Sequence, residues 1–138
     1  MTTTDFILRL LAAMGAGLII GFERQWQHKS AGLRTNTLVA TGAALFVLLS
    51  INLTQYGGDS TRIIGQVVTG IGFLGAGIIF KEGSNVRGLT TAATVWCSAA
   101  IGSVAAGGYY WETLIGVVAV ISINLLLNPL GLWLSKRK

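Results

Sequence analysis

Two short polar junctions between long apolar runs carry the residues of this chain that could do chemistry. The first junction holds Glu23, Arg24 and Arg34, and the second holds Glu82 and Arg87. Ionised groups at membrane depth are costly and usually pair, so one interpretation is that the glutamates pair with these arginines and fix two helical hairpins. The other is that the two carboxylates meet in a cation or proton site, because Mg²⁺ favours oxygen ligands. The strongly positive surroundings favour the first interpretation, and Glu23 and Glu82 are the candidate metal ligands of the second.

A second polar set lies inside the apolar runs. It contains the carboxamides of Gln66 and Asn124, and a series of hydroxyl residues along one run: Thr90, Thr91, Thr94, Ser98 and Ser103. Hydrogen bonds between such groups on membrane helices average only about 0.6 kcal/mol, which is typical of ties that hold helices together. A polar path through the bundle is the alternative. Because no continuous file of acidic residues crosses the predicted membrane, the sequence disfavours a proton pump.

The composition excludes several classes of protein. Of the 138 residues, 52% are hydrophobic and 11% are charged, whereas soluble domains carry about 25% charged residues. One Pro, one Cys and one His exclude a disulfide scaffold, a Cys/His zinc module and any catalytic scheme that needs two histidines. We therefore predict a membrane protein that is not an enzyme and holds no cofactor.

Five apolar runs must form the elements that position these residues. A helix needs about 20 mostly apolar residues to cross a bilayer core of about 30 Å. The runs of that size are residues 6–22, 37–53, 63–80, 89–106 and 111–134. The sequence thus predicts an all-α protein whose residues 1–138 form a single transmembrane domain, with no room for a separate soluble domain.

Lysine and arginine collect at one end of the predicted helices. That end holds Arg24, Lys29, Arg34, Lys81, Arg87, Lys136, Arg137 and Lys138. The opposite end holds Arg62, while Arg9 lies inside the first run, where Asp5 is its expected partner one turn away. Because short basic loops stay in the cytoplasm, we predict an outside N-terminus and an inside C-terminus. The net charge of +5 then suits anionic lipid rather than nucleic acid.

The first two hairpins resemble each other in sequence. Residues 15–20 (GAGLII) match residues 75–80 (GAGIIF), and each block is followed by a glutamate, a basic residue and a Gly-Leu-x-Thr element, at 32–35 and 88–91. Both hairpins start outside, so the pattern predicts a parallel internal repeat about an axis along the membrane normal. The fifth helix is then an addition.

Small residues recur at helical spacing and predict close helix packing. Gly17 and Gly21 lie in the first run, and Gly72, Gly75 and Gly77 in the third. Small side chains let membrane helices approach closely, either inside the bundle, the favoured interpretation, or across a homodimer. The stretch 70–77 contains a pattern like a dinucleotide-binding loop, but it follows no strand, so we reject that function.

Four strings in this order closely resemble the MgtC/SapB family of bacterial inner-membrane proteins. They are ERQW at 23–26, AGLRT at 31–35, GIGFLGAG at 70–77 and RGLTTAAT at 87–94, and the likeness covers essentially the whole chain. The resemblance implies a role in growth at low magnesium, acid adaptation or survival inside macrophages. It also implies, for virulence-type members, inhibition of the F-type ATP synthase rather than magnesium transport.

The chain departs from that family pattern in two places. Virulence-type members commonly continue into a cytoplasmic C-terminal domain, whereas this chain stops at residue 138, either as a short member or as a shortened chain. Some of those members carry Asn where this chain has Thr90, so the role of Thr90 decides whether ATP synthase inhibition transfers. The resemblance carries over eight motif positions as the functional set: Glu23, Arg24, Arg34, Glu82, Arg87, Gly88, Thr90 and Thr94.

These observations lead to one principal hypothesis about function, one main alternative and a third hypothesis, which is a purely structural subunit. The principal hypothesis is a homodimeric, multi-pass inner-membrane protein that modulates another membrane complex, such as the F-type ATP synthase, through its cytoplasmic loops. The alternative is a small oligomeric transporter or channel for Mg²⁺ or protons that uses Glu23, Glu82 and the hydroxyls of residues 89–106.

Overall fold

A computed structural model describes residues 1–136 of the chain, with the backbone alone at Lys81. Five helices are each long and apolar enough to cross a membrane, as predicted. They are α1 (Thr3–Trp26), α2 (Leu33–Thr54), α3 (Ser60–Ile78), α4 (Leu89–Ala106) and α5 (Tyr110–Ser135), and two short strands, β1 (Phe80–Glu82) and β2 (Asn85–Arg87), separate α3 from α4. The predicted range of α4 is confirmed exactly, while α1, α2 and α5 extend beyond their apolar runs.

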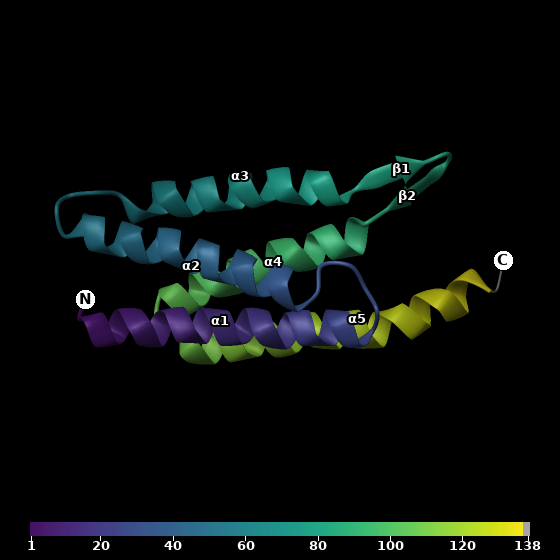
Figure 1. Ribbon diagram of the computed structural model, residues 1–138, viewed down its shortest axis with the longest axis horizontal. Helices are drawn as coiled ribbons and strands as arrows, with labels where there is room; N and C mark the ends of the chain where they lie inside the picture. Colours follow the sequence, from purple (N-terminus) through teal and green to yellow (C-terminus); the bar gives the residue numbers. More distant parts are fainter. Residues whose placement is uncertain (137–138) are drawn as a thin grey trace.

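The third helix ends two residues before the predicted end of its run at residue 80. Residues 79–80 leave the predicted helix, and Phe80 starts an antiparallel hairpin in which it faces Arg87. Gly83 in the turn has a positive φ of 63°, which glycine adopts without steric cost. In Figure 1 this hairpin projects past the end of α3.

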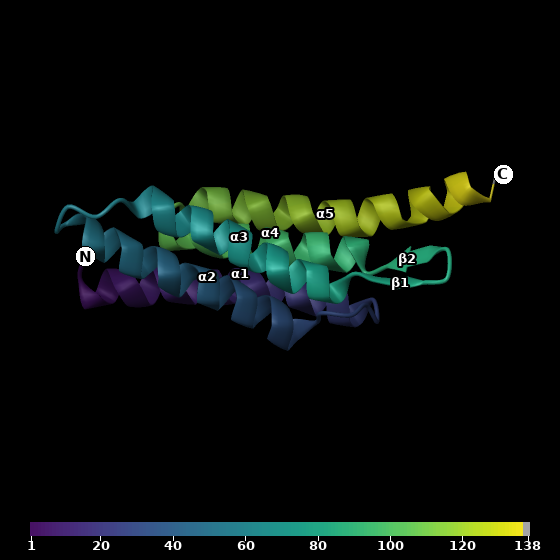
Figure 2. The same ribbon diagram turned by 90° about the horizontal axis from the view of Figure 1, so that it is seen from above.

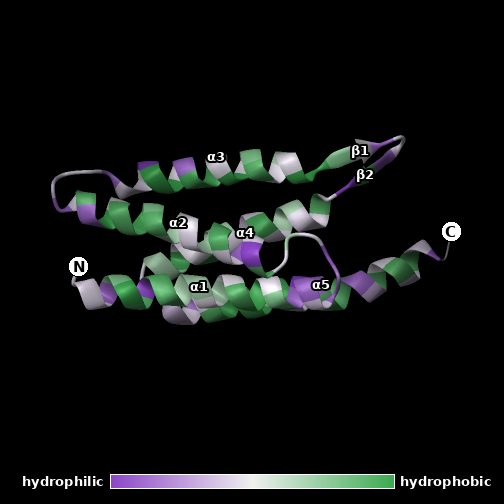
Figure 3. Ribbon diagram, viewed as in Figure 1, coloured by the Kyte–Doolittle hydropathy of each residue, from purple (hydrophilic) through white to green (hydrophobic). Residues whose placement is uncertain are grey.

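The bundle has one end where most polar connections gather. We define the basic end as the loop 27–32, the hairpin 80–87 and the last turn of α5; Figure 1 shows all three at the side opposite the N-terminus. Figure 3 shows hydrophilic colour over β2, over the C-terminal end of α1 and at the tip of α5, while apolar colour covers much of the helices. Of the basic residues predicted at this end, Arg137 and Lys138 lie outside the described residues.

Helix α4 forms the centre of the bundle. It packs against each of the four other helices, and Figures 1 and 2 together show it surrounded by them. In its most apolar stretch 56% of the residues are buried, against 6% in α3 and in α5. The core is built from small side chains, among them Ala13, Ala44 and Ala105, so the helices at the centre come close together.

The predicted packing glycines divide into two groups. A Cβ atom on Gly17 would lie 2.7 Å from the carbonyl oxygen of Asn36, and one on Gly21 would lie 2.7 Å from that of Gly32, so both glycines are needed where α1 meets α2. Gly75 has ordinary room beside Ala92. A Cβ on Gly72 or Gly77 would meet nothing within 4 Å, so the packing role of these two glycines stays a prediction from the sequence.

The two predicted hairpins pack differently. Helices α1 and α2 meet backbone against backbone, whereas α3 meets α4 loosely at Gly75. Their connections also differ, since a loop joins the first pair and strands β1 and β2 join the second. The internal repeat therefore stays a prediction from the sequence.

Arg9 does not pair with Asp5 as expected. Asp5 forms a capping box with Thr2 at the start of α1. The Arg9 guanidinium instead donates from Nη1 to the carbonyl oxygen of Ala106, at 3.0 Å. Arg9 thus satisfies a carbonyl at the C-terminus of α4, where a cation is favourable.

Candidate functional site at the basic end

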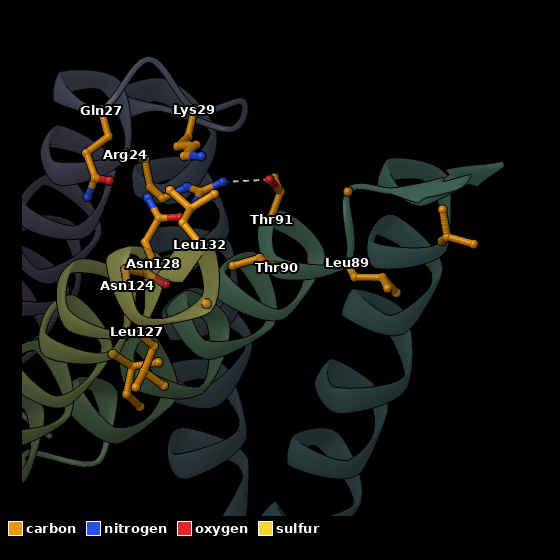
Figure 4. A pocket seen from close by; sticks show the side chains of 14 residues that line it. Arg24, Gln27, Lys29, Leu89, Thr90, Thr91, Asn124, Leu127, Asn128 and Leu132 are labelled. Carbon is orange, nitrogen blue, oxygen red and sulfur yellow. Dashed lines mark hydrogen bonds between the residues drawn. The ribbon is translucent and has the colours of Figure 1, made fainter. Parts of the chain in front are cut away.

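A cavity of about 600 Å³ opens at the basic end between the C-terminal turn of α1, the N-terminus of α4 and the second half of α5. Figure 4 shows the side chains that line it. The cations among them are Arg24 and Lys29, and the amides are Gln27, Asn124 and Asn128. The remaining part of the wall includes Gly88, Thr90, Thr91 and apolar residues of α5 such as Ile123 and Leu127.

Arg24 lines this cavity, and 3% of its surface is exposed. Its Nη2 donates to the Thr91 hydroxyl at 2.5 Å and to the Ser30 carbonyl oxygen at 3.2 Å. Its buried Nε has no hydrogen-bond partner among the described residues. The guanidinium therefore joins α1 to α4 and to the loop 27–32, while its buried Nε stays without a partner among the described residues.

Glu23 precedes Arg24 in α1 and belongs to a polar cluster that joins α1, α4 and α5. The amide of Asn124 on α5 donates to its Oε2 at 3.2 Å, and Gln27 donates to its other oxygen. Asn124 also lies 3.4 Å from the Thr94 hydroxyl of α4. The sequence placed Glu23, Thr94 and Asn124 in the functional or intramembrane sets, and the structure brings them into one cluster, which we call the Glu23 cluster.

The second glutamate lies in a different environment. Glu82 and Arg87 form an ion pair of 3.4 Å on the projecting hairpin, where both side chains are largely exposed. Each glutamate has its own partners, since Glu23 contacts amides and Glu82 contacts an arginine. The pairing interpretation thus describes Glu82 but not Glu23, whose hydrogen bonds come from Gln27 and Asn124. Nor do the described residues contain a group of three or more His, Cys, Asp or Glu side chains that could hold a metal ion.

The other predicted site residues lie in three kinds of position. Gly88 is the N-cap of α4 with φ +87°, and a Cβ there would collide with the carbonyl oxygen of Ile78, so this position requires glycine. Thr90 is exposed on the cavity wall. Arg34 is exposed on the first turn of α2 and does not line the cavity, and Gln66 is exposed on α3.

Sequence reasoning missed one buried polar pair. The Ser98 hydroxyl on α4 donates to Oδ1 of Asn36 on α2 at 2.7 Å, and the Asn36 amide donates to the carbonyl oxygens of Ala31 and Gly32. Asn36 is completely buried, so it fixes the start of α2 against the central helix. Its signal was a carboxamide at the edge of an apolar run, next to the Gly-Leu-x-Thr element.

Comparison with known proteins finds a matching family profile and several relatives of this chain. The MgtC family profile matches residues 10–133. The chain is 54% identical over 129 residues to the protein MgtC of Salmonella typhimurium, covering 93% of this chain and 54% of that one. It is 56% identical over 121 residues to the protein MgtC of Brucella abortus, covering 88% and 50%.

A further relative is an uncharacterized protein of Synechocystis, 49% identical over 135 residues, with 98% of this chain and 57% of that one covered. The chain spans about half the length of the curated relatives it matches. No solved structure matches it. The family profile extends over nearly the whole chain, including the cavity residues of α1, α4 and α5, and the chain therefore belongs to the MgtC family.

Proposed function

We propose that this chain is a multi-pass protein of the bacterial inner membrane, without enzymatic activity, that acts on another membrane complex at its basic end. The proposed role is adaptation to low magnesium, to acid or to the interior of macrophages. The F-type ATP synthase is the proposed partner. Similarity to two proteins named MgtC supports this proposal.

The observation that carries the proposal is the cavity at the basic end. Arg24, Gly88 and Thr90 come from the family strings at 23–26 and 87–94 and all line it, although the two strings are far apart in sequence. The buried part of the wall is fixed by Arg24 and the Glu23 cluster, while Thr90 is exposed. A fixed polar surface at the end of a bundle suits contact with a partner complex in the same membrane.

The proposed orientation places the basic end in the cytoplasm. Most of the lysines and arginines lie within or beside the connections at this end in the sequence: Arg24, Lys29, Arg34, Lys81, Arg87, Lys136, Arg137 and Lys138. Basic segments of this length are retained on the cytoplasmic side. The cavity would then face the side where the ATP synthase hydrolyses ATP.

ATP-driven proton pumping in inverted bacterial membrane vesicles tests the function. Vesicles containing the unmodified chain should acidify more slowly with ATP than vesicles without it. Pumping driven by NADH oxidation should be unchanged, because it does not use the ATP synthase. Thr90→Asn is compared with Thr54→Asn, the same substitution at the opposite end of the bundle.

The outcomes separate the hypotheses. Inhibition by the unmodified chain and by Thr54→Asn supports the proposal. If the Thr90→Asn variant inhibits ATP-driven pumping and the unmodified chain does not, then Thr90 is the reason that the unmodified chain lacks the partner contact. Unchanged pumping with every variant contradicts the proposal, and slower acidification with both ATP and NADH points to proton leakage through the chain itself.

One observation favours a transporter as a second candidate. Glu23 is buried between α1, α4 and α5, and its carboxylate is held by neutral amides rather than by an arginine. A buried carboxylate inside a membrane bundle is a candidate contact for an ion that crosses the bundle. Mg²⁺ and proton flux into proteoliposomes of the purified chain, with Glu23→Gln as the variant, checks this candidate, and equal flux with and without the chain excludes it.

A further inference from the structure

We propose that the cavity at the basic end binds a phosphate group, held between the N-terminus of α4 and the guanidinium of Arg24. The ligand class is an anion bearing phosphate, either the headgroup of an anionic phospholipid or soluble inorganic phosphate. The inference uses the same cavity as the proposed function and adds the chemistry of a ligand to it.

The N-terminus of α4 supplies the first part of the site. Gly88 is the N-cap and provides no side-chain hydrogen bond, and the first helical bond runs from the Ala92 N–H to the Gly88 carbonyl oxygen at 2.8 Å. The N–H groups of the three preceding residues therefore have no partner within the helix. All three of these residues, Leu89, Thr90 and Thr91, line the cavity. Such a terminus attracts an anion because its N–H groups and the helix dipole both favour negative charge.

Arg24 supplies an independent second observation. It is 3% exposed and lines the cavity (Figure 4), yet its Nε has no partner among the described residues. A buried donor without an acceptor costs folding free energy. A phosphate oxygen would satisfy it, and the planar guanidinium matches phosphate geometry. The bond from Nη2 to Thr91 fixes the guanidinium beside the first turn of α4.

The charges around the cavity favour an anion over a cation. Lys29 adds a second positive charge, and its backbone N–H bonds to the carbonyl oxygen of Arg24 at 2.9 Å, which keeps the two residues adjacent. The neighbouring carboxylate of Glu23 is already held by Gln27 and Asn124. Arg24, Lys29 and the helix N-terminus are positive, and the single nearby carboxylate, Glu23, is already hydrogen-bonded. The net charge around the cavity is therefore positive.

The walls of the cavity fit either source of phosphate. Asn128 adds an amide to the wall, while Ile123, Leu127 and Leu132 of α5 form an apolar side. The apolar side would contact acyl chains if the ligand is a lipid. The helix N-terminus and the two cations serve the phosphate in both cases.

The test measures binding to the purified full chain in two arms. In the first, calorimetry measures inorganic phosphate binding to the chain in nanodiscs of phosphatidylcholine. In the second, native mass spectrometry compares retained lipid after purification from vesicles of equal phosphatidylglycerol and phosphatidylcholine. Saturable phosphate binding identifies a soluble ligand, and retention of phosphatidylglycerol at about one molecule per chain identifies a lipid.

Three variants locate the binding. Lys29→Gln, at an exposed position, should weaken it by about threefold or more. Arg24→Lys should weaken phosphate binding by about tenfold, because the lysine ammonium group cannot reproduce the planar pair of N–H donors of a guanidinium. Arg62→Gln removes one charge at the opposite end and should leave binding unchanged.

Two results would overturn the inference. One is the lack of both saturable phosphate binding and preferential phosphatidylglycerol retention in the unmodified chain. The other is an equal loss with Arg62→Gln and Lys29→Gln, which would indicate general charge attraction. If Arg24→Lys unfolds in a thermal denaturation control, Lys29→Gln against Arg62→Gln still decides the question. Both arms use the purified chain, so a failure of ATP synthase inhibition leaves this test unaffected.

Discussion

At the scale of single residues, Asn124 has the most consequential contacts. It is a carboxamide on an apolar helix, and it reaches both Glu23 on α1 and Thr94 on α4. Asn124→Leu would remove a donor from a buried carboxylate, which costs about 1–3 kcal/mol. We expect the free energy of unfolding, measured by denaturant titration in mixed micelles, to fall by that amount.

The matched control for this residue lies one turn further along α5. Asn128→Leu makes the same substitution at an exposed position and should change the free energy of unfolding by less than about 0.5 kcal/mol. Equal losses in the two variants would show that the Glu23 cluster does not stabilise the fold.

At the scale of helices, two glycines on α1 make a direct comparison possible. Gly17→Ala would place a Cβ 2.7 Å from the backbone of α2, whereas Gly15→Ala would place one in open space. Backbone cannot move aside cheaply, so Gly17→Ala should destabilise the protein by about 1–3 kcal/mol. Gly15→Ala should be neutral or stabilise it by up to about 1 kcal/mol through helix propensity. Thermal unfolding of both variants checks this, and a stable Gly17→Ala protein would contradict the close contact of α1 and α2.

The N-cap of α3, Asp59, should make the stability of this helix depend on pH. The Asp59 carboxylate accepts hydrogen bonds from the Thr61 hydroxyl at 2.6 Å and from its backbone N–H at 2.9 Å. The hydroxyl first, and then the N–H, lower the pKa of Asp59 below its ordinary value. A lowered pKa in the folded state means stability that is present above the unfolded value of about 3.9 and is lost as the pH falls through the folded value.

Asp59→Ala should therefore reduce the unfolding temperature at pH 7, and the difference from the unmodified chain should shrink as the pH falls below about 4. Asp59→Asn keeps a neutral N-cap acceptor, so its unfolding temperature relative to Asp59→Ala should stay the same across that range. A difference between the unmodified chain and Asp59→Ala that does not change with pH would contradict a role for the charged cap.

At the scale of the whole molecule, α3 is one of the two least buried helices, together with α5. Within its span Gly75 alone is buried, Gly72 and Gly77 meet nothing within 4 Å, and Gln66 is exposed on the same helix. Small residues permit close approach of a second helix, so we expect the predicted homodimer to form through α3. Light scattering of the purified protein in detergent should then give a dimer mass for the unmodified chain.

Gly72→Leu should shift that mass to the monomer, because the larger side chain keeps a second copy of α3 away. Gly42→Leu is the control, since the Cβ position of Gly42 on α2 is also open but lies on a different helix. A monomer in the unmodified chain, or a dimer that persists in Gly72→Leu, would remove α3 as the interface.

From the sequence alone we could predict the number of membrane helices, the range of α4 and the collection of basic residues at one end. Each of these follows from local composition, since a run of about 20 apolar residues has few alternatives to a membrane helix. The contacts of Gly17 and Gly21 were also predictable, because two glycines four residues apart lie on one face of a helix.

The contacts between polar groups, in contrast, depend on how the helices pack in three dimensions. Hydropathy does not fix how each helix is rotated or which helices are neighbours, so it could not join Glu23 to Asn124, Arg9 to Ala106 or Asn36 to Ser98. It likewise could not separate Glu82 from Glu23, because that depends on a hairpin of six paired residues turning away from the bundle. The cavity also depends on which helices are neighbours. Its walls come from α1, α4 and α5, which the packing around α4 brings together.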